Sequence, residues 1–477
     1  MEPDSEKISK RKRINPALAI LLSFLIIILI GSFLLVCPFS QANGQWGDYV
    51  DSLTTAVSAT CVTGISTYEE GFANTLSFWG ELFSIIMVQI GGLGFITILV
   101  FVVSMFKHRF RFDNMVYFTQ IVGGTSFGGI IKLVRKIISI QLVVELIGFL
   151  LGLPVFIKMF PNDPGSACWY SIFHSISAFN NAGFDLFEGT SSLIGGLFAT
   201  GGEPITGGLY YYFCSYIMIL ILVGGLSFIA IIEIFSFKRR PKQYTSFTKI
   251  ALYMTLFIVV INSLLLFISD GFKGEGSISY FDCLFQTVSA RTAGFMTYSQ
   301  DNLSIAGKTI SSMTMFIGGS PLSTAGGIKT TTIFIIIIAI FSFFKGRKIT
   351  AFKREFSQKT VTKALALLVV SLIIVIVGFL AFTGFGFDPR YTYGEGPLAL
   401  NTSQSMAYAY EVFSCFGTTG FFTGIEPYLS VGSKIIMCLL MFFGRLGPMT
   451  FFQIFEKNME KDDNRKYKFV DDDVLIG

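Results

Sequence analysis

The sequence predicts an all-α membrane protein in which eight transmembrane helices form four parallel repeats. Three observations predict this fold class. Hydrophobic residues make up 52% of the 477 residues and charged residues only 14%, against roughly 25% in a typical soluble domain. Apolar runs of membrane-spanning length recur along the chain, and four near copies of a small-residue turn ending in glycine are spaced along it. Such a chain cannot cover itself with polar surface, so we expect it to be solvated by lipid.

The first span is predicted over residues 16–36, PALAILLSFLIIILIGSFLLV, which has about the 20 residues needed to cross a bilayer. The basic sequence KRKR at 10–13 precedes it, as in a secretory signal peptide. However, the apolar run exceeds the roughly 7–15 residues of a signal, and no typical cleavage site follows. We therefore expect a retained span. Another is predicted over residues 361–382, VTKALALLVVSLIIVIVGFLAF.

Cysteine and histidine usage argues against metal and catalytic sites. The seven cysteines form no Cys-x-x-Cys pair and mostly lie in or beside apolar runs, so neither a disulfide framework nor a zinc site is expected. His108 and His174 are far apart in the chain. The sequence AGKT at 306–309 lacks the first glycine of a phosphate-binding loop, since Asn302 occupies its place. We do not expect the chain to be an enzyme, because the sequence shows no set of acid, base and nucleophile that could form one active site. A hydrolase assay would test the rival hypothesis of a membrane enzyme.

The four small-residue turns divide the chain into similar units. They are SATCVTGI (58–65), SAFNNAGF (177–184), SARTAGF (289–295) and SCFGTTGF (414–421), and their glycines lie 119, 111 and 126 residues apart. Such regular spacing indicates internal duplication. Each turn follows an amphipathic segment, of about 11–15 residues, that is too short to span a bilayer: WGDYVDSLTTAVSAT, WYSIFHSISAF, SYFDCLFQTVSA or SQSMAYAYEVFSCF. Each unit therefore reads as a span, a re-entrant helix with its loop, and a second span.

The distribution of charge predicts the orientation of these units. Lys and Arg cluster in residues 1–15, 107–136, 238–249, 345–363 and 457–468. The positive-inside rule makes these segments cytoplasmic, so all four turns enter from outside and the repeats are parallel rather than inverted. The predicted parts are a cytoplasmic basic N-terminus (1–15), repeats over 16–106, 107–237, 238–344 and 345–456, and a cytoplasmic C-terminal tail (457–477).

The outward segments are acidic, with Asp48, Asp51, Glu69 and Glu70 in the first unit. An acidic mouth raises the local concentration of cations. An ordinary solvated face explains any single one of these residues equally well.

Four re-entrant turns around one axis predict a pseudo-fourfold pore. A ring of backbone carbonyls can replace the water shell of a cation, glycine allows the backbone angles this needs, and short helices ending at the turns point their negative ends toward the ion. A glycine-rich helix-packing motif would explain one such turn, but not four evenly spaced ones. The residues expected to form the filter are Cys61, Val62, Thr63, Gly64, Asn180, Asn181, Ala182, Gly183, Arg291, Thr292, Ala293, Gly294, Gly417, Thr418, Thr419 and Gly420.

Over about residues 14–456, the chain resembles the Trk/Ktr/HKT superfamily of potassium transporters. The motifs that carry the resemblance are SATCVTG, QIGGLGF (89–95), SAFNNAGF, SARTAGF, GGSPLSTAGGIKTTT (318–332) and FFGRLGPMT (442–450). One span precedes the first turn, whereas Trk-type subunits usually carry an extra pair of helices there, so the chain looks more like a Ktr-type membrane subunit.

The resemblance implies potassium uptake across the cell membrane, with potassium as the substrate and no cofactor on this chain. Gly64 stands where some plant HKT members carry serine, which favours potassium over sodium. Potassium would be held at Thr60, Val62, Thr63, Asn180, Asn181, Thr292, Ala293, Thr418 and Thr419.

A second predicted element obstructs the inner half of the pore. Residues 309–344 form an apolar stretch too long for one crossing, and its middle, GGSPLSTAGG, predicts a broken helix; a simple kink fits the extra length poorly. By resemblance this is an intramembrane gate loop. Arg445 lies in the apolar run IIMCLLMFFGRLGPMTFF, where an arginine costs roughly 2.5–3.5 kcal/mol unless it faces protein or water, and the family places its gating arginine in this motif. The expected gate residues are Gly318, Gly319, Ser320, Pro321, Ser323, Thr324, Gly326, Gly327, Lys329 and Arg445.

Two further basic side chains, those of Arg291 and Lys329, need partners. Arg291 occurs only in the third turn and would block a cation path if it pointed inward, so we expect it behind the filter, paired with an acid such as Asp282 or Glu411. The sequence does not choose between these two acids. Lys329 follows the gate loop and is expected to snorkel or to pair.

The resemblance also implies a homodimer that binds a separate cytosolic ring of nucleotide-binding regulatory subunits. The basic loops KRRPK (238–242) and KGRKITAFKRE (345–355) suit that ring or anionic membrane lipid equally well, and no nucleic-acid partner is expected. The alternative function is a potassium symporter coupled to sodium or protons. It predicts ionisable groups along the path, but few lie in or near spans, namely Glu145, Glu233, Lys329 and Arg445, so uptake driven by the membrane potential is favoured.

Overall fold

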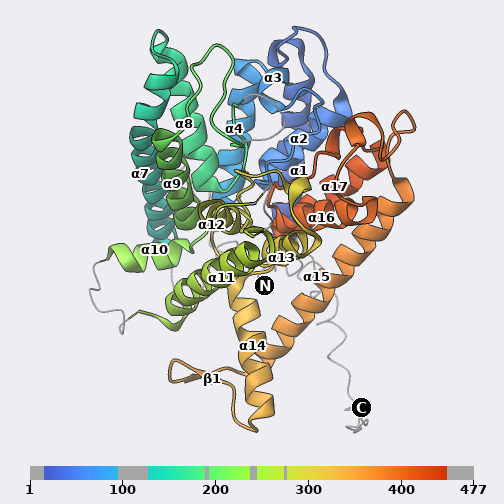
Figure 1. Ribbon diagram of the computed structural model, residues 1–477. Helices are drawn as coiled ribbons and strands as arrows, with labels where there is room; N and C mark the ends of the chain where they lie inside the picture. The colour runs from blue at the N-terminus through green and yellow to red at the C-terminus, as the bar shows by residue number, and fades with distance from the viewer. Residues whose placement is uncertain (1–15, 95–126, 188–192, 237–243, 273–276, 448–477) are drawn as a thin grey trace, which may run out of the picture.

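The computed structural model describes residues 16–94, 127–187, 193–236, 244–272 and 277–447 (Figure 1). Within these ranges the chain is mostly helical, as the sequence predicts, and its named strands form one short hairpin. The basic termini 1–15 and 457–477, the loop 238–242 and most of the basic segment 107–136 lie outside the described residues, as do the predicted unit boundaries near 106, 237 and 456.

The helices follow one another as a long helix, a short helix and a second helix, four times over. The first group is α1 (Pro16–Val36), α2 (Tyr49–Cys61) and α4 (Phe78–Leu93), with the single turn α3 (Phe72–Thr75) between the last two. The second is α7 (Phe127–Met159), α8 (Pro164–Asn180), α9 (Gly208–Gly224) and α10 (Phe228–Phe235). The third is α11 (Ser246–Asp270), α12 (Tyr280–Ser289), α13 (Ile305–Phe316) and α14 (Thr330–Phe344). The fourth is α15 (Gln358–Phe385), α16 (Gln404–Gly417) and α17 (Val431–Leu446).

The four short helices begin at polar residues and end at the four turns. Asp48 caps α2 by accepting from two backbone N–H groups, and Asp163 caps α8 in the same way. Because Pro164 follows that cap at the first helical position, which suits proline, α8 has 17 residues and starts earlier than the segment predicted from Trp169. The other short helices have 13, 10 and 14 residues, about the predicted length.

The short helices connect successive groups into a closed arrangement. Each one packs against the second helix of the group before it: α8 against α4, α12 against α9, and α16 against α13. The cycle closes because α2, near the start of the chain, packs against α17, near its end. Figure 1 shows this closure as the blue and red parts of the ribbon lying side by side.

The outer surface is apolar, as expected for a chain in lipid. Three described helices are long and apolar enough to cross a membrane, at Lys132–Met159, Ser246–Asp270 and Gln358–Phe385, and the pair α9 and α10, bent by 102°, would make a fourth. On α15, Ile376 and Leu380 are 57% and 61% exposed, whereas Val375 and Phe382 are buried. This outward apolar face reverses the pattern of a soluble amphipathic helix.

The predicted break in the third group lies between α13, which ends at Phe316, and α14, which begins at Thr330. Two backbone hydrogen bonds close the neck of the loop between them, from Gly318 N to Ile328 O (2.9 Å) and from Ile328 N to Phe316 O (3.2 Å). The intervening chain is therefore a compact loop, which we call the gate loop (residues 317–329), and not a kink in a continuous helix.

The basic loop after α14 forms a hairpin of β1 (Thr350–Ala351) and β2 (Arg354–Glu355). Its two central residues, Phe352 and Lys353, have φ angles of 51° and 63°, which are unfavourable for residues other than glycine. Packing offsets this strain, because the Phe352 ring stacks between Tyr253 of α11 and Phe334 of α14, with centroid distances of 5.9 and 6.0 Å. The hairpin thus ties α14, near its first turn, to α11.

Candidate functional site

The four turns share one backbone pattern. Val62, Asn181 and Thr418 end their short helices with φ angles of 59°, 59° and 49°, and Thr292 has a φ of 73°. Two residues later each turn has a glycine of positive φ: Gly64 (94°), Gly183 (72°), Gly294 (87°) and Gly420 (91°). Positive φ at β-branched Val and Thr is strained and persists only where the surroundings impose it, so the packing around the turns holds this shape.

The turns contact one another in a closed ring. A Cβ added to Gly183 would lie 2.5 Å from the carbonyl oxygen of Ala293, and one added to Gly294 would lie 2.6 Å from that of Thr419. Likewise, a Cβ on Gly64 would collide with the carbonyl of Ala182, and one on Gly420 with the carbonyl of Thr63. Each turn therefore faces the next, and the fourth returns to the first. The predicted filter segments meet at one place, where there is no room for a side chain on these glycines.

A second glycine motif, which the sequence reasoning missed, brings the inner helices to this ring. Gly91, Gly224 and Gly444 lie directly against the carbonyls of Thr60, Phe179 and Phe416, each four residues before a turn glycine. These three glycines begin GGLG (91–94), GGLS (224–227) and GRLG (444–447), and GGSP (318–321) begins the break in the third group. Comparison of the four repeats would have found the signal, because Arg445 occupies the second position, which is glycine in the other three.

The gate loop is fixed beneath the second and fourth turns. Ser320 N donates to Gly225 O (3.1 Å), Thr324 Oγ1 donates to Gly224 O (2.9 Å), and Phe228 N donates to Leu322 O (3.0 Å). The loop thus occupies the bend between α9 and α10. At its other end Gly326 lies against the side chain of Thr418 in the fourth turn, where an added Cβ would collide.

Two basic side chains hold the gate loop. Arg445 donates through Nη1 to the carbonyl of Thr324 and through Nη2 to that of Gly91. Lys329 Nζ donates to the carbonyls of Ala325 (2.7 Å) and, more weakly, Gly326 (3.3 Å). The expected pairing of Lys329 is therefore with main-chain carbonyls of the loop itself. Arg445 joins the loop to the second helix of the first group.

Arg291 lies behind the turns, as expected, but the prediction that it pairs with Asp282 or Glu411 is wrong. Its Nη2 donates to Thr255 Oγ1 of α11 (3.2 Å), and the side chain is buried. Asp282 instead accepts from Ser279 at the start of α12 (2.5 Å), and Glu411 accepts from Thr423. Arg291 thus ties the third turn to a neighbouring long helix through a neutral hydroxyl.

Each short helix also braces the segment that leaves its turn. In the first group, the Ser52 hydroxyl pairs with the Tyr68 hydroxyl (3.2 Å). In the others, Leu186 N donates to His174 Nε2 (3.4 Å), Gln286 Nε2 donates to Tyr298 O (3.0 Å), and Thr423 N donates to Glu411 Oε1 (2.8 Å). His174, Gln286 and Glu411 lie eight or nine residues before their turn glycines, so similar positions carry different chemistry.

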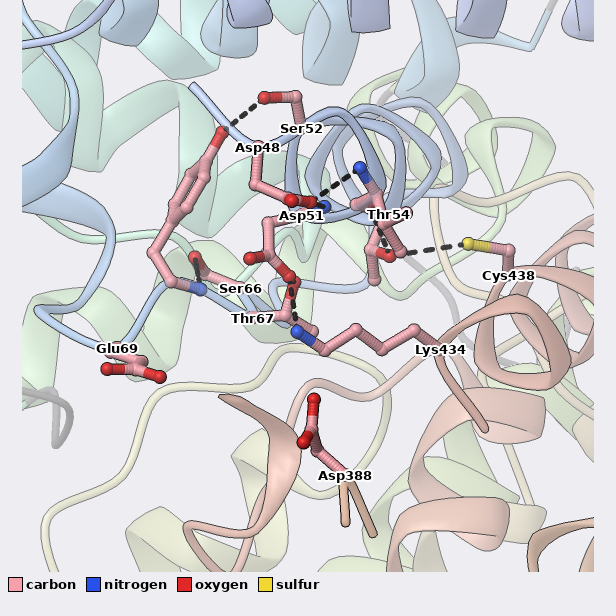
Figure 2. A network of polar contacts seen from close by, with 12 residues as sticks. Asp48, Asp51, Ser52, Thr54, Ser66, Thr67, Glu69, Asp388, Lys434 and Cys438 are labelled. Atoms are coloured by element: carbon pink, nitrogen blue, oxygen red, sulfur yellow. Dashed lines mark hydrogen bonds and ion pairs between the residues drawn. The ribbon is translucent and has the colours of Figure 1, made fainter. Parts of the chain in front are cut away.

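An ion pair joins the fourth group to the first beside this brace. Lys434 of α17 lies 2.5 Å from Asp51 of α2, and Thr67, just after the first turn, also donates to Asp51 (2.7 Å). Figure 2 shows Lys434 reaching across from its helix to this carboxylate. Both side chains are largely buried, so removing either one would leave an uncompensated charge.

A polar network fixes the second turn. Glu145 of α7 is buried and accepts from Gln89 (2.8 Å), Gln141 (2.9 Å) and Asn180 (3.1 Å). The Asn180 side chain also donates to Gln89 Oε1 (2.9 Å). Because the side-chain amide of Asn180 is engaged in this network, only the backbone of Asn180 is available to the ring of turns. Glu233, the other acid expected near a span, accepts from Thr245 and Thr248 at the start of α11.

A cavity of about 300 Å³ lies over the ring, on the side of the segments that leave the turns. Its lining includes Gly64, Gly183 and Gly294 and, from the fourth group, Thr423. The carboxyl groups in this lining are those of Asp185, Asp301 and Glu426. The ring is therefore approached through an acidic hollow.

Comparison with known proteins identifies relatives of this chain. A family model described as "TrkH: Cation transport protein" matches residues 15–272 and 273–467. The chain is 32% identical to the "Potassium/sodium uptake protein NtpJ" of Enterococcus hirae over 98% of both chains, and 30% identical to the "Ktr system potassium uptake protein B" of Bacillus subtilis over the full length of both. The crystal structure of the potassium transporter TrkH from Vibrio parahaemolyticus superposes with a TM-score of 0.68 at 17% identity, covering 95% of this chain and 87% of the other. The last likeness concerns the fold.

Proposed function

The chain belongs to the family of TrkH cation transport proteins, and from this premise we propose that it takes up potassium across the cell membrane through a selectivity filter built by its four turns. The family consists of membrane ion transporters, so the chain is not an enzyme. In the proposed architecture eight transmembrane helices form four parallel repeats, over 16–106, 107–237, 238–344 and 345–456, around a pseudo-fourfold pore.

The closed ring of turns is the observation that carries this proposal. Each turn glycine leaves space for a carbonyl of the next turn, and carbonyl oxygens gathered on one axis can replace the water shell of potassium. The hydroxyl oxygens of Thr60, Thr63 and Thr418 are buried in these turns without a hydrogen-bond partner among the described residues. Since buried oxygens normally have a partner, these hydroxyls also suit a cation.

The gate loop and its two basic residues are proposed to close the inner half of the pore. The loop is joined to α4 by Arg445 and held in shape by Lys329. Opening then requires that the bonds of Arg445 to the Thr324 and Gly91 carbonyls break. Phe352 of the hairpin contacts both α11 and α14, and α14 begins directly after the gate loop. A movement of the hairpin on the cytoplasmic side would therefore be transmitted to the gate loop through α14.

We place both termini and the basic hairpin in the cytoplasm. Relatives named as parts of a Ktr system support a separate cytosolic regulatory ring, and the proposed assembly is a homodimer on that ring, surrounded by membrane lipid. Arg347, Lys348 and Lys353 of the hairpin region are exposed and suit either an acidic surface of the ring or anionic lipid.

Sodium-coupled or proton-coupled symport is the second candidate, because one relative is named as a potassium/sodium uptake protein. Against proton coupling, Glu145 is already hydrogen-bonded by three amide groups behind the second turn. Its carboxylate is thus occupied as a structural acceptor.

Expression in a host that lacks its own potassium uptake tests the function. We expect the chain, together with a cytosolic Ktr subunit, to accelerate uptake of rubidium used as a potassium tracer, and excess potassium to compete with it. A control in α15, Gly384→Ala, should take up rubidium like the wild type, since nothing lies within 4 Å of an added Cβ there. Rubidium uptake no faster than in the empty host, with the protein present in the membrane, would refute the proposal.

A further inference from the structure

Two buried glutamates lie behind the fourth turn. Glu411 is on α16, nine residues before Gly420, and Glu426 opens the short 3-10 helix Glu426–Tyr428 that follows the turn. Their exposed fractions are 0% and 2%. Neither forms an ion pair in the described part of the chain. An isolated buried carboxylate is very costly, so this pair needs another source of stability.

One carboxyl oxygen of each glutamate is buried without a hydrogen-bond partner in the described part of the chain. Glu411 Oε1 accepts from Thr423 N (2.8 Å) and Thr423 Oγ1 (3.0 Å). Among the described residues no donor reaches these two oxygens, Glu411 Oε2 and Glu426 Oε1, and each carboxyl group has the other as a hydrogen-bonding neighbour. Two carboxyl oxygens can bond only through a proton, and adjacent buried carboxyls do not both ionise.

Resting on the proposed function of the turns, we propose that Glu411 and Glu426 share one proton and act as positioning residues for the fourth filter turn. Thr423 comes three residues after Gly420. With the proton present, Glu411 of α16 is hydrogen-bonded both to Thr423 and to Glu426, and the segment after the turn is held against α16. When the proton is lost to a base in the outer solution, two negative charges repel each other, Glu426 moves away, and the turn loses its brace.

The outer solution has a route to this proton. Glu426 and Thr423 both line the cavity above the ring. In the first group Thr67, also three residues after its turn glycine, donates to Asp51, but that carboxylate is paired with Lys434 and not with a second acid. The second and third braces are made by His174 and Gln286. The fourth turn is therefore the one whose brace depends on a carboxyl proton. We infer that external alkalinity weakens selectivity at this turn.

Other titratable and charged groups surround the pair, and their effects on the pH response must be distinguished from that of the pair. On its own elements and on those packed against them these include Tyr408, Tyr410, Cys415, Tyr428, Asp301, Lys308, Lys434, Cys438 and Arg445. Lys434 is held by Asp51, and Lys308 donates to the carbonyls of Asp301 and Leu303. Tyr428 is in the same short helix as Glu426, so it gives the matched control.

The test compares potassium-to-sodium permeability ratios in liposomes that contain the purified chain, with the outer solution varied from mildly acidic to strongly alkaline pH, because burial favours the protonated form of a carboxyl group and only an alkaline solution removes its proton. We expect the wild-type ratio to fall several-fold as the outer pH rises. Glu426→Gln keeps a permanent N–H donor toward Glu411, and we expect its ratio to stay constant over the range. Tyr428→Phe should retain the wild-type response.

Glu411→Gln provides a second variant, since its amide can accept from Thr423 and donate to Glu426; it should also be insensitive to pH. A wild-type ratio that does not change with pH would overturn the inference, as would Gln variants that keep the wild-type response. A wild type that carries no potassium at any pH would instead refute the proposed function. The two failures are thus distinguishable.

Discussion

Arg445→Ala is expected to conduct potassium at least about tenfold faster than the wild type. Its guanidinium joins the Thr324 carbonyl of the gate loop to the Gly91 carbonyl of α4. Hydrogen bonds from a charged group contribute about 1.5–3 kcal/mol each, so losing both shifts the balance between closed and open loop by more than a factor of 10. Removal of the positive charge also lowers the electrostatic barrier to a cation below the filter.

The measurement is the initial rate of potassium flux per reconstituted protein. Arg390→Ala is the control, because Arg390 is exposed, pairs with neighbouring Asp388 and lies far from the gate loop in the chain. Arg445→Lys should fall in between, since an ammonium keeps the charge but lacks the fork that reaches two carbonyls. A folded Arg445→Ala protein with unchanged or slower flux would show that this arginine does not close the path.

Gly420→Ala is expected to abolish selective potassium flux. The added Cβ would collide with the Thr63 carbonyl of the first turn, and the φ of 91° is one that alanine adopts poorly. The contact between the fourth and first turns closes the ring, so forcing it apart disturbs carbonyls of two turns at once. We expect loss of at least about 100-fold in flux, since misplacement of about 1 Å at a preorganised site has effects of that order.

Flux of potassium and of sodium should be measured for this variant beside Gly384→Ala, whose added methyl group meets nothing within 4 Å. Thermal unfolding of both purified proteins shows whether the fold survives. Wild-type potassium selectivity in a folded Gly420→Ala protein would mean that the turns do not form the filter.

Local patterns in the sequence were enough to predict the turns and the break in the third group. Positive φ favours glycine at the last position of each turn, and Gly and Pro within an apolar run end a helix, so both features can be recognised from a few consecutive residues. The bend between α9 and α10 was not predicted, although GGLS at 224–227 is a comparable signal. Its role becomes visible only when the gate loop is seen to occupy it.

Pairing between distant residues could not be predicted from the sequence. Lys434 and Asp51 are 383 positions apart, and the local sequence around either residue does not indicate that the two form a pair. The partner of Arg291 was expected to be an acid because buried charges usually pair, yet the structure gives it the Thr255 hydroxyl. Glu411, one of the two acids considered for it, instead faces a second carboxyl group. Tertiary packing decides such contacts, and a pattern of residue types leaves several solutions open.

The most direct test of the central claim is cation-resolved flux into liposomes that hold only this chain, under a clamped membrane potential and with a gradient of potassium, rubidium or sodium. If the ring of turns is a selective pathway, potassium and rubidium will follow the electrical gradient and sodium will be carried poorly. Flux that requires an accompanying or opposing sodium or proton gradient would contradict this account, because the ring would then be a binding site within a coupled transporter.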